Sequence, residues 1–192
     1  MRYITVMGML LDRFKCVVAA LSLTVAFAPP IAAQENLLDE LYQDLAEAEP
    51  ADSLRIENRI VAEWEKSGSA AMDLLLRRGQ EALEDGQPEA AVEHFSALVD
   101  HAPMFSEGYF GRASSYYLLG LTGPALDDIE TVLRLNPRHF AAMTGLAVVM
   151  EELGRPDDAL EIYRMVLDIH PNLAEALAAT ERLELELEGQ AL

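Results

Sequence analysis

The sequence predicts an all-α protein: an α-solenoid of three helical hairpins, preceded by a degenerate hairpin and followed by a capping helix. The first observation is internal repetition, because the segments 86–103, 120–137 and 154–171 follow one pattern at a spacing of 34 residues. A period of roughly 20 to 50 residues is typical of stacked supersecondary units. The second observation is that glycine, alanine and proline keep the same phase in all three copies. These residues are Gly86, Gly120 and Gly154; Ala91, Ala125 and Ala159; and Pro103, Pro137 and Pro171.

Residues 1–33 are predicted to be a secretory signal peptide that is cleaved after Ala33. Basic residues near the start precede the apolar run 16–28, and small residues follow it, which is the pattern of a cleaved export signal. The alternative is an uncleaved membrane anchor. A spanning helix needs about 18 or more apolar residues, whereas this run is shorter and Pro29–Pro30 follows it. We therefore expect export, with no membrane span in the mature chain.

The composition narrows the choice of partner. The chain of 192 residues has a net charge of −19, and 51% of its residues are hydrophobic, which fits one globular domain. Removing residues 1–33 takes away the only cysteine and leaves 11 basic and 32 acidic residues, a net charge of −21. Such a surface repels nucleic acid and anionic membranes. A protein partner with some basic residues fits this charge, and so does a merely soluble, self-repelling exterior.

The segment 34–71 is predicted to form a degenerate helical hairpin that caps the first clear repeat. Apolar residues recur at helical spacing in 36–49 and again in 52–67, on either side of Pro50. The first stripe is Leu37, Leu38, Leu41, Tyr42 and Leu45, and the second is Leu54, Ile56, Ile60, Val61 and Trp64.

The repeats are predicted over 72–105, 106–139 and 140–173, each as two helices. A glycine follows each first helix, where it adopts the left-handed backbone of a helix end at little cost. Pro88, Pro124 and Pro156 stand near the start of the second helices, where a missing N–H costs nothing. The closing prolines end these helices. The segment 174–192 is expected to be a final helix whose polar outer face ends the stack.

Small residues near the middle of the helices allow the two helices of a repeat to pack closely. They are Gly79, Ala113 and Ala147 on the first helices and the alanine series on the second. The larger residues Phe95, Ile129 and Tyr163 are expected to fill the space beside them. One hairpin cannot bury its own apolar face, so the three must stack into a continuous core.

The pattern over 72–173 resembles the tetratricopeptide repeat (TPR), a helical hairpin of 34 residues that stacks into a right-handed superhelix. The small residues, the large-residue series and the closing prolines carry this resemblance. Three positions depart from the family. Its usual first-helix tryptophan is Leu75, Tyr109 and Met143 here, and Arg78 and Arg112 replace a leucine. An alanine usual near the end of the second helix is Leu98, Val132 and Val166. The resemblance implies a protein-interaction module that is not an enzyme and needs no cofactor.

The resemblance also implies a partner-binding groove, because the first helices line the concave surface in this family. Apolar anchors at its centre and acidic residues at its edge would make a typical interface. The residues carried over are Asp73, Leu76, Gln80, Leu83, Glu107, Phe110, Ser114, Tyr117, Thr144, Val148 and Glu151, with Ala141, Phe105 and His139 beside them.

Family members that grip a C-terminal carboxylate use basic and amide side chains on these helices. The corresponding positions here are Leu76, Gln80, Gly111, Ala141 and Gly145. Such a clamp is therefore absent, and recognition of a chaperone tail is not expected.

Catalytic and metal chemistry finds little support in the sequence. Neither HExxH nor CxxC occurs, so we expect the four histidines, His94, His101, His139 and His170, to be solvated residues near repeat ends rather than ligands. Paired acids such as Asp127–Asp128 are expected to stay solvated on helix surfaces. No GxSxG, P-loop or dinucleotide motif is present.

We therefore expect an exported protein that binds a protein segment in its groove, as an adaptor or assembly factor of the bacterial periplasm. One alternative is a structural module that self-associates, as a homo-oligomer, through its stack ends or its groove. In a variant of that alternative, the helix 36–49 or the C-terminal helix fills the groove and makes it part of the core. An envelope enzyme is the least supported class.

Overall fold

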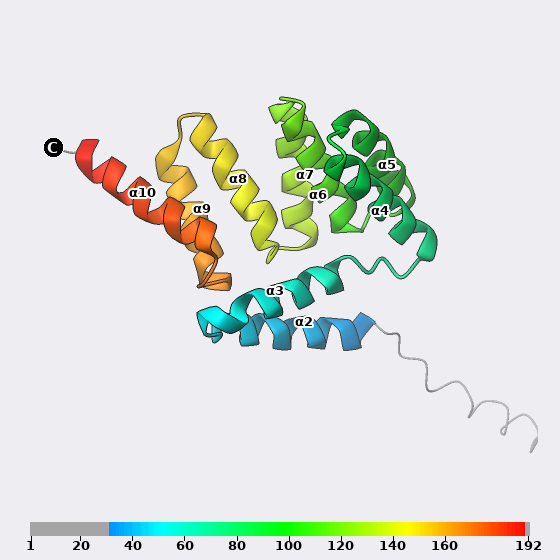
Figure 1. The fold of residues 1–192 in the computed structure, drawn as a ribbon, viewed down its shortest axis with the longest axis horizontal. Coiled ribbons are helices and arrows are strands. Elements are labelled where there is room, and N and C mark those ends of the chain that lie inside the picture. Colours follow the sequence, from blue (N-terminus) through cyan, green and yellow to red (C-terminus); the bar gives the residue numbers. More distant parts are fainter. Residues whose placement is uncertain (1–30, 191–192) are drawn as a thin grey trace, which may run out of the picture. The chain divides into compact units, whose positions relative to one another are not determined.

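The computed structural model describes residues 31–190, so the predicted signal peptide lies almost wholly outside the described residues. Within 31–190 the chain forms nine helices and no strand, which confirms the predicted all-α class (Figure 1). The predicted cleavage site after Ala33 falls inside the first of these helices, and its use stays a prediction. The helices are α2 (Ile31–Ala46), α3 (Pro50–Trp64), α4 (Ala70–Glu84), α5 (Pro88–His101), α6 (Ser106–Leu118), α7 (Thr122–Leu135), α8 (Phe140–Glu152), α9 (Pro156–Ile169) and α10 (Ala174–Gln190).

The turns inside the three repeats have the same geometry because each depends on one glycine. Gly86, Gly120 and Gly154 have φ angles of 69°, 71° and 70°, a left-handed conformation that costs glycine little. The next residue then donates its N–H back into the helix, as Gln87 does to the Ala82 carbonyl at 2.8 Å. This is the Schellman end of a helix. The antiparallel hairpins α4–α5, α6–α7 and α8–α9 follow directly.

The core of the repeats lies between these hairpins. The alanine series is fully buried, at 0% exposure for Ala91, Ala125 and Ala159. Beside it, the buried side chains Phe95, Ile129 and Tyr163 occupy equivalent positions on α5, α7 and α9. Burial of such apolar groups contributes roughly 2 to 3 kcal/mol for each large side chain, and it holds successive hairpins together.

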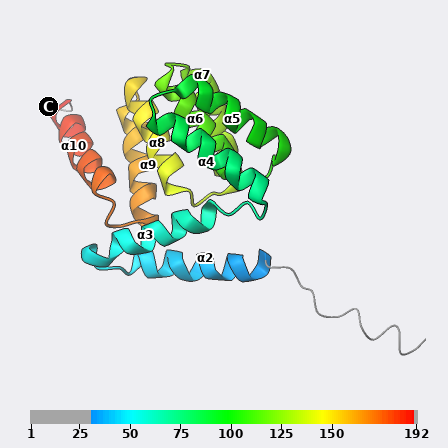
Figure 2. The same ribbon diagram turned by 45° about the vertical axis from the view of Figure 1, so that its right-hand side comes forward.

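The hairpin α2–α3 packs against the loops that close the second and third repeats (Figures 1 and 2). The Tyr42 hydroxyl donates to the Arg138 carbonyl at 3.1 Å, and the Asn172 side chain donates to the Ala48 carbonyl at 2.7 Å. The Trp64 ring lies 4.9 Å from the Phe140 ring. The hairpin contacts the first repeat as well, where Gln80 of α4 donates to Glu65 at 2.6 Å, and its role as a cap of that repeat stays a prediction. The contacts of Tyr42 and Trp64 with the later repeats are not indicated by the sequence pattern.

Helix α10 packs on α9 at the other end of the repeats. It buries Ala176, Ala179 and Leu183, and Arg164 of α9 donates to Glu184 at 2.8 Å. Its outer face is less polar than expected of a cap, since Leu185 is 66% exposed. In the part of the chain that the structure describes, no helix is long and apolar enough to cross a membrane.

Candidate functional site on the inner wall of the repeats

The first helices of the repeats, α4, α6 and α8, carry the residues predicted to line a groove. Two hollows lie along this wall. We call the first the lower cavity: it holds about 160 Å³ between α3, α4, α6 and the start of α8. We call the second the inter-repeat pocket: it holds about 380 Å³ between α6 and α8, with α7 behind it and α10 at its edge. Phe110 and Ser114 line both hollows.

The lower cavity is closed on one side by the hairpin. Val61, Trp64 and Glu65 line it from α3 and the residue that follows. Six predicted groove residues of α4 and α6 line it as well: Leu76, Gln80, Leu83, Glu107, Phe110 and Ser114. Leu76 and Glu107 are buried, and the Gln80 amide donates to the Glu65 carboxylate at 2.6 Å. This half of the predicted groove is therefore largely occupied by the protein itself.

His139 joins the hairpin to the repeats. Its ring stacks on Trp64, with centroids 4.2 Å apart, and lies 4.6 Å from the ring of Phe110. Its Nδ1 accepts from the Ala142 N–H at 3.1 Å and so caps α8. Since Nδ1 is an acceptor, Nε2 carries the proton and donates to Glu107 at 3.1 Å.

The expectation that the histidines are solvated is wrong for two of them. His139 is 0% exposed and His170 is 1% exposed, with its Nε2 3.2 Å from Glu57. His139 follows the closing turn of the second repeat and His170 precedes that of the third, and side chains of α3 contact both. Neither spacing nor composition indicates these contacts. His101 is exposed and His94 is half-buried, as expected of surface positions. Among residues 31–190, no group of three or more metal-binding side chains comes together.

One acid pair also departs from expectation. Asp128 is buried, and it accepts two hydrogen bonds from Arg112, at 2.7 and 2.8 Å. Bidentate pairs of this kind are strong and geometrically specific. Arg112, which stands where the family has a leucine, therefore ties α6 to α7 through a charge. Asp127 is exposed, as expected.

The inter-repeat pocket is the open half of the inner wall. Its lining is apolar apart from Ser114 and Glu175, and the Ser114 hydroxyl already donates to the Phe110 carbonyl at 2.9 Å. Its mouth is exposed, because Tyr117 is 37% and Leu118 is 62% exposed. The lining residues are Phe110, Ala113, Ser114, Tyr117 and Leu118 of α6, Ile129 of α7, Gly145, Val148 and Val149 of α8, and Glu175 of α10.

Three predicted groove residues serve the fold instead. Asp73 accepts from the Ser67 N–H at 3.1 Å and fixes the turn before α4. Thr144 is buried, with its hydroxyl donating to the Phe140 carbonyl at 2.9 Å. Glu151 accepts from Tyr163 at 3.0 Å and pairs with Arg182. Burial and this carboxylate raise the pKa of Tyr163 above the ordinary range.

The chain's own terminal helices fill the predicted groove only in part. Trp64 of α3, rather than the helix 36–49, covers the lower cavity. Helix α10 contributes Glu175 to the edge of the inter-repeat pocket and leaves its mouth open. The inner wall thus has a self-occupied half and an open half.

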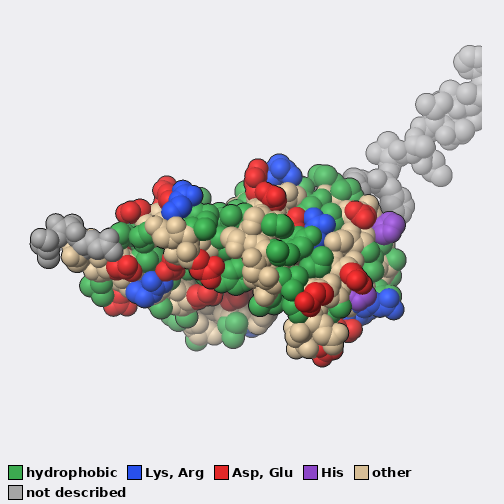
Figure 3. Space-filling model, turned by 90° about the horizontal axis from the view of Figure 1, so that it is seen from above, with side chains coloured by type: hydrophobic (Ala, Val, Ile, Leu, Met, Phe, Trp, Pro, Cys, Tyr) green, Lys and Arg blue, Asp and Glu red, His purple; other side chains and the backbone are tan. Residues whose placement is uncertain are grey.

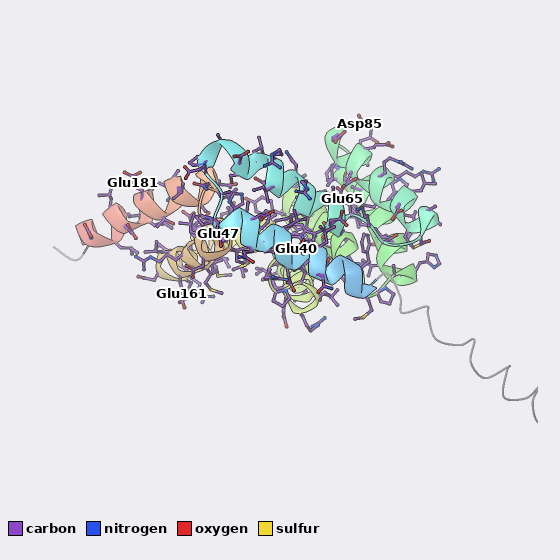
Figure 4. The ribbon with its side chains drawn as sticks, turned by 90° about the horizontal axis from the view of Figure 1, so that it is seen from below. Glu40, Glu47, Glu65, Asp85, Glu161 and Glu181 are labelled. Carbon is purple, nitrogen blue, oxygen red and sulfur yellow. The ribbon has the colours of Figure 1, made fainter. Side chains whose placement is uncertain are left out.

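The surface around this wall is acidic. Glu175 lies at the edge of the inter-repeat pocket, and Glu152 accepts from the Tyr117 hydroxyl at 2.5 Å. Seen from above, hydrophobic side chains gather over the middle of the protein, with acidic side chains on either side (Figure 3). Further acids lie on the outside of their helices, among them Glu40, Glu161 and Glu181 (Figure 4).

Comparison with known proteins identifies the repeat type. A model of the tetratricopeptide repeat matches residues 76–123 and 124–174, more than half of the chain. A TPR repeat-containing protein of Rhizobium etli is 31% identical over 153 residues, which cover 79% of this chain and 75% of that protein. The small glutamine-rich tetratricopeptide repeat-containing protein 2 of Saccharomyces cerevisiae is 27% identical, over 66% of this chain and 36% of its own length.

Solved structures have the same fold. The first TPR of Spaghetti (RPAP3), bound to an HSP90 peptide, has a TM-score of 0.58 at 22% identity and covers 61% of this chain and 93% of its own. MamA has a TM-score of 0.56 at 21% identity, over 81% of this chain and 84% of its own. At these identities the likeness concerns the fold.

Proposed function

Because this chain belongs to the tetratricopeptide repeat family, whose repeats are protein-interaction modules, we propose that its inner wall holds a segment of another protein. The observation that carries this proposal is the inter-repeat pocket. About 380 Å³ lies within the usual range for ligand sites, roughly 300 to 1,000 Å³. An apolar hollow with an exposed mouth on the wall that faces inward is a place for a partner's side chain.

The charge around the pocket indicates the chemistry of the partner. Glu175 lines the pocket, and Glu152 accepts a hydrogen bond from Tyr117 at its mouth. The whole chain has a net charge of −19. A bound segment that combines an apolar side chain with neighbouring basic residues would satisfy both the lining and the charge. Complementary charge of this kind chiefly speeds association and selects partners.

The bound peptide of the RPAP3 structure supports the idea that this fold can hold a segment of another protein. The contacts would differ here. Positions where carboxylate-gripping repeats carry basic or amide side chains are Leu76, Gly111, Ala141 and Gly145 in this chain, and Gln80 is already engaged by Glu65. We therefore propose recognition through an apolar anchor rather than through a terminal carboxylate.

We further propose that the protein acts as an adaptor or assembly factor in the bacterial periplasm. The support is the export pattern of residues 1–33 and the similarity to a protein of Rhizobium etli. Mass spectrometry of the protein from fractionated cells tests the location. Periplasmic material that begins at Gln34 is expected, and full-length material in the cytoplasm would contradict export.

The binding proposal is tested by photo-crosslinking in intact cells. A photoreactive phenylalanine analogue replaces Tyr117 at the pocket mouth or, as a matched control, Met165, which is 49% exposed on α9. Both positions are exposed and apolar, but only Tyr117 lines the pocket. We expect a discrete adduct with another protein from position 117 and none from position 165. Equal adducts from both, or none from 117, would overturn the proposal.

Self-association is a second candidate, favoured by the outer face of α10. Leu177 and Leu185 are 47% and 66% exposed on this terminal helix, where a second copy could continue the stack. Light scattering of the purified protein separates the two functions. A monomer whose partner is captured through position 117 supports the adaptor, whereas a dimer lost on replacing Leu177 and Leu185 by Glu supports self-association.

A further inference from the structure

The three junctions between successive helical units have one equivalent side chain each, and they differ in size. In phase with the 34-residue repeat, Phe95, Ile129 and Tyr163 follow one another on α5, α7 and α9. Each lies between a small residue of one first helix and a small residue of the next. Two of the three are aromatic, and the middle one is aliphatic.

At the first junction the aromatic ring lies tightly between the two first helices, and the smaller lower cavity of about 160 Å³ lies beside it. Phe95 is 0% exposed, and its ring lies against the backbone of α4 and of α6. A Cβ atom added at Gly79 would come within 2.5 Å of that ring, and one added at Gly111 would collide with it as well. The ring is therefore held between two glycines.

At the third junction an aromatic ring again takes this place. Tyr163 is 2% exposed, and its hydroxyl donates to Glu151 at 3.0 Å. In the register of the repeat, the small residues to either side are Ala147 of α8 and Ala179 of α10, both buried.

At the second junction the corresponding space stays partly open. Ile129 stands in the place of the ring, with Ala113 of α6 and Gly145 of α8 as its small neighbours. All three residues line the inter-repeat pocket. A Cβ added at Gly145 would meet no atom within 4 Å, in contrast to Gly111 one repeat earlier. Isoleucine thus stands where the other two junctions have an aromatic ring, and a hollow of about 380 Å³ with room for a ring remains there.

We propose that the inter-repeat pocket is a socket for an aromatic side chain of the partner segment, which takes the place that Phe95 takes at the first junction. This inference rests on the proposed function and specifies its ligand. The neighbouring acids Glu175 and Glu152 select a basic residue beside that aromatic side chain. Ile129 and Gly145 determine specificity, because their size sets the depth of the socket.

Nuclear magnetic resonance of the full protein tests the socket with defined probes. The probe is N-acetyl-phenylalanyl-arginine amide, and the matched control is N-acetyl-alanyl-arginine amide. We expect the first to shift the Gly145 amide resonance in a saturable way. The alanine control should bind at least about tenfold more weakly, since burying an aromatic ring favours binding by at least that factor. Equal responses to the two probes would overturn the inference.

Variants of the socket provide the second arm. Ile129→Phe fills the hollow from behind and Gly145→Leu fills it from α8, and both should abolish the preference for the phenylalanine probe. Met165→Phe adds the same ring on the exposed side of α9 and should leave the preference unchanged. If one filling variant fails to fold, the other retains the test. A preference that survives in a folded filling variant would overturn the socket.

The two proposals fail in different ways. Suppose that the photoreactive residue at position 117 crosslinks a partner equally with Ile129 and with the Ile129→Phe substitution. The proposed socket is then wrong, and the adaptor function stands. If the probes bind as expected but position 117 captures no protein in cells, the socket stands and the adaptor function is wrong.

Discussion

The ring of Trp64 stacks on the ring of His139, with the centroids 4.2 Å apart and the planes 25° from parallel. This contact links the hairpin α2–α3 to the start of α8, and it lies beside the lower cavity. The Trp64 N–H also donates to the Tyr42 hydroxyl at 3.2 Å, so the contact belongs to a buried network. Hence the hairpin and the later repeats should unfold together.

Replacing His139 by alanine should destabilise the protein more than replacing an exposed histidine. We expect His139→Ala to lower the free energy of unfolding by about 3 kcal/mol or more, because it removes a buried ring, the cap of α8 and the shorter of two hydrogen bonds to Glu107. Urea denaturation followed by circular dichroism measures this change. His101→Ala, at an exposed position, is the control and should change stability by less than about 0.5 kcal/mol. Similar small changes for both variants would contradict the buried network.

Two glycines at equivalent positions should respond oppositely to alanine. Gly111→Ala forces a methyl group into the Phe95 ring and should destabilise the protein by about 1 to 3 kcal/mol. Gly145→Ala meets no neighbour and should stabilise it by up to about 1 kcal/mol, since alanine is the better helix former. Thermal unfolding of both variants measures the difference. Changes of the same sign would show that the second junction is as tightly packed as the first.

Alkaline pH should weaken the hairpin through Tyr42. Burial raises the pKa of Tyr42 to about 12, from about 10 in the unfolded chain. Between these values the unfolded state loses the proton first, so the stability present below pH 10 falls as the pH rises toward 12, by about 2 to 3 kcal/mol. Denaturation at a series of pH values measures the slope. In Tyr42→Phe the free energy of unfolding should fall less steeply with pH over this interval. An unchanged dependence on pH would show that groups other than Tyr42 cause it.

Substitutions of Tyr117 and Phe110, two aromatic residues of the predicted groove, should affect binding and stability differently. Tyr117→Ala should leave stability within about 0.5 kcal/mol, because the side chain is 37% exposed, and it should abolish capture of the partner. Phe110→Ala should destabilise the protein by about 2 kcal/mol or more, because its ring packs against His139. Pull-down together with urea denaturation measures both effects. If Tyr117→Ala still captures the partner fully, Tyr117 does not belong to the binding surface.

Local signals in the sequence predict the helical repeats well. The glycines of the three turns adopt the positive φ that their position indicates, and the alanine series is buried as its phase requires. These features depend on short segments, where each residue type has one physical role. The all-α class and the family follow from them.

Contacts between distant segments could not be predicted in the same way. Nothing in the spacing of His139 indicates that Trp64 covers it, and nothing near Gln80 indicates its bond to Glu65. The predicted groove residues Leu76 and Glu107 are buried for the same reason. One feature of the sequence does point to the inter-repeat pocket, because Ile129 is the one aliphatic residue in the series with Phe95 and Tyr163. That open space lies beside Ile129 follows only from the surroundings of Gly111 and Gly145 in the structure.

Hydrogen exchange with and without the captured partner tests the central claim most directly, namely that the open half of the inner wall is where another protein binds. Binding should slow amide exchange in α6 and α8, around Tyr117 and Val148, and leave the exposed side of α9 around Met165 unchanged. Slowed exchange confined to α9 or to the outer face of α10, with α6 and α8 unaffected, would contradict the account.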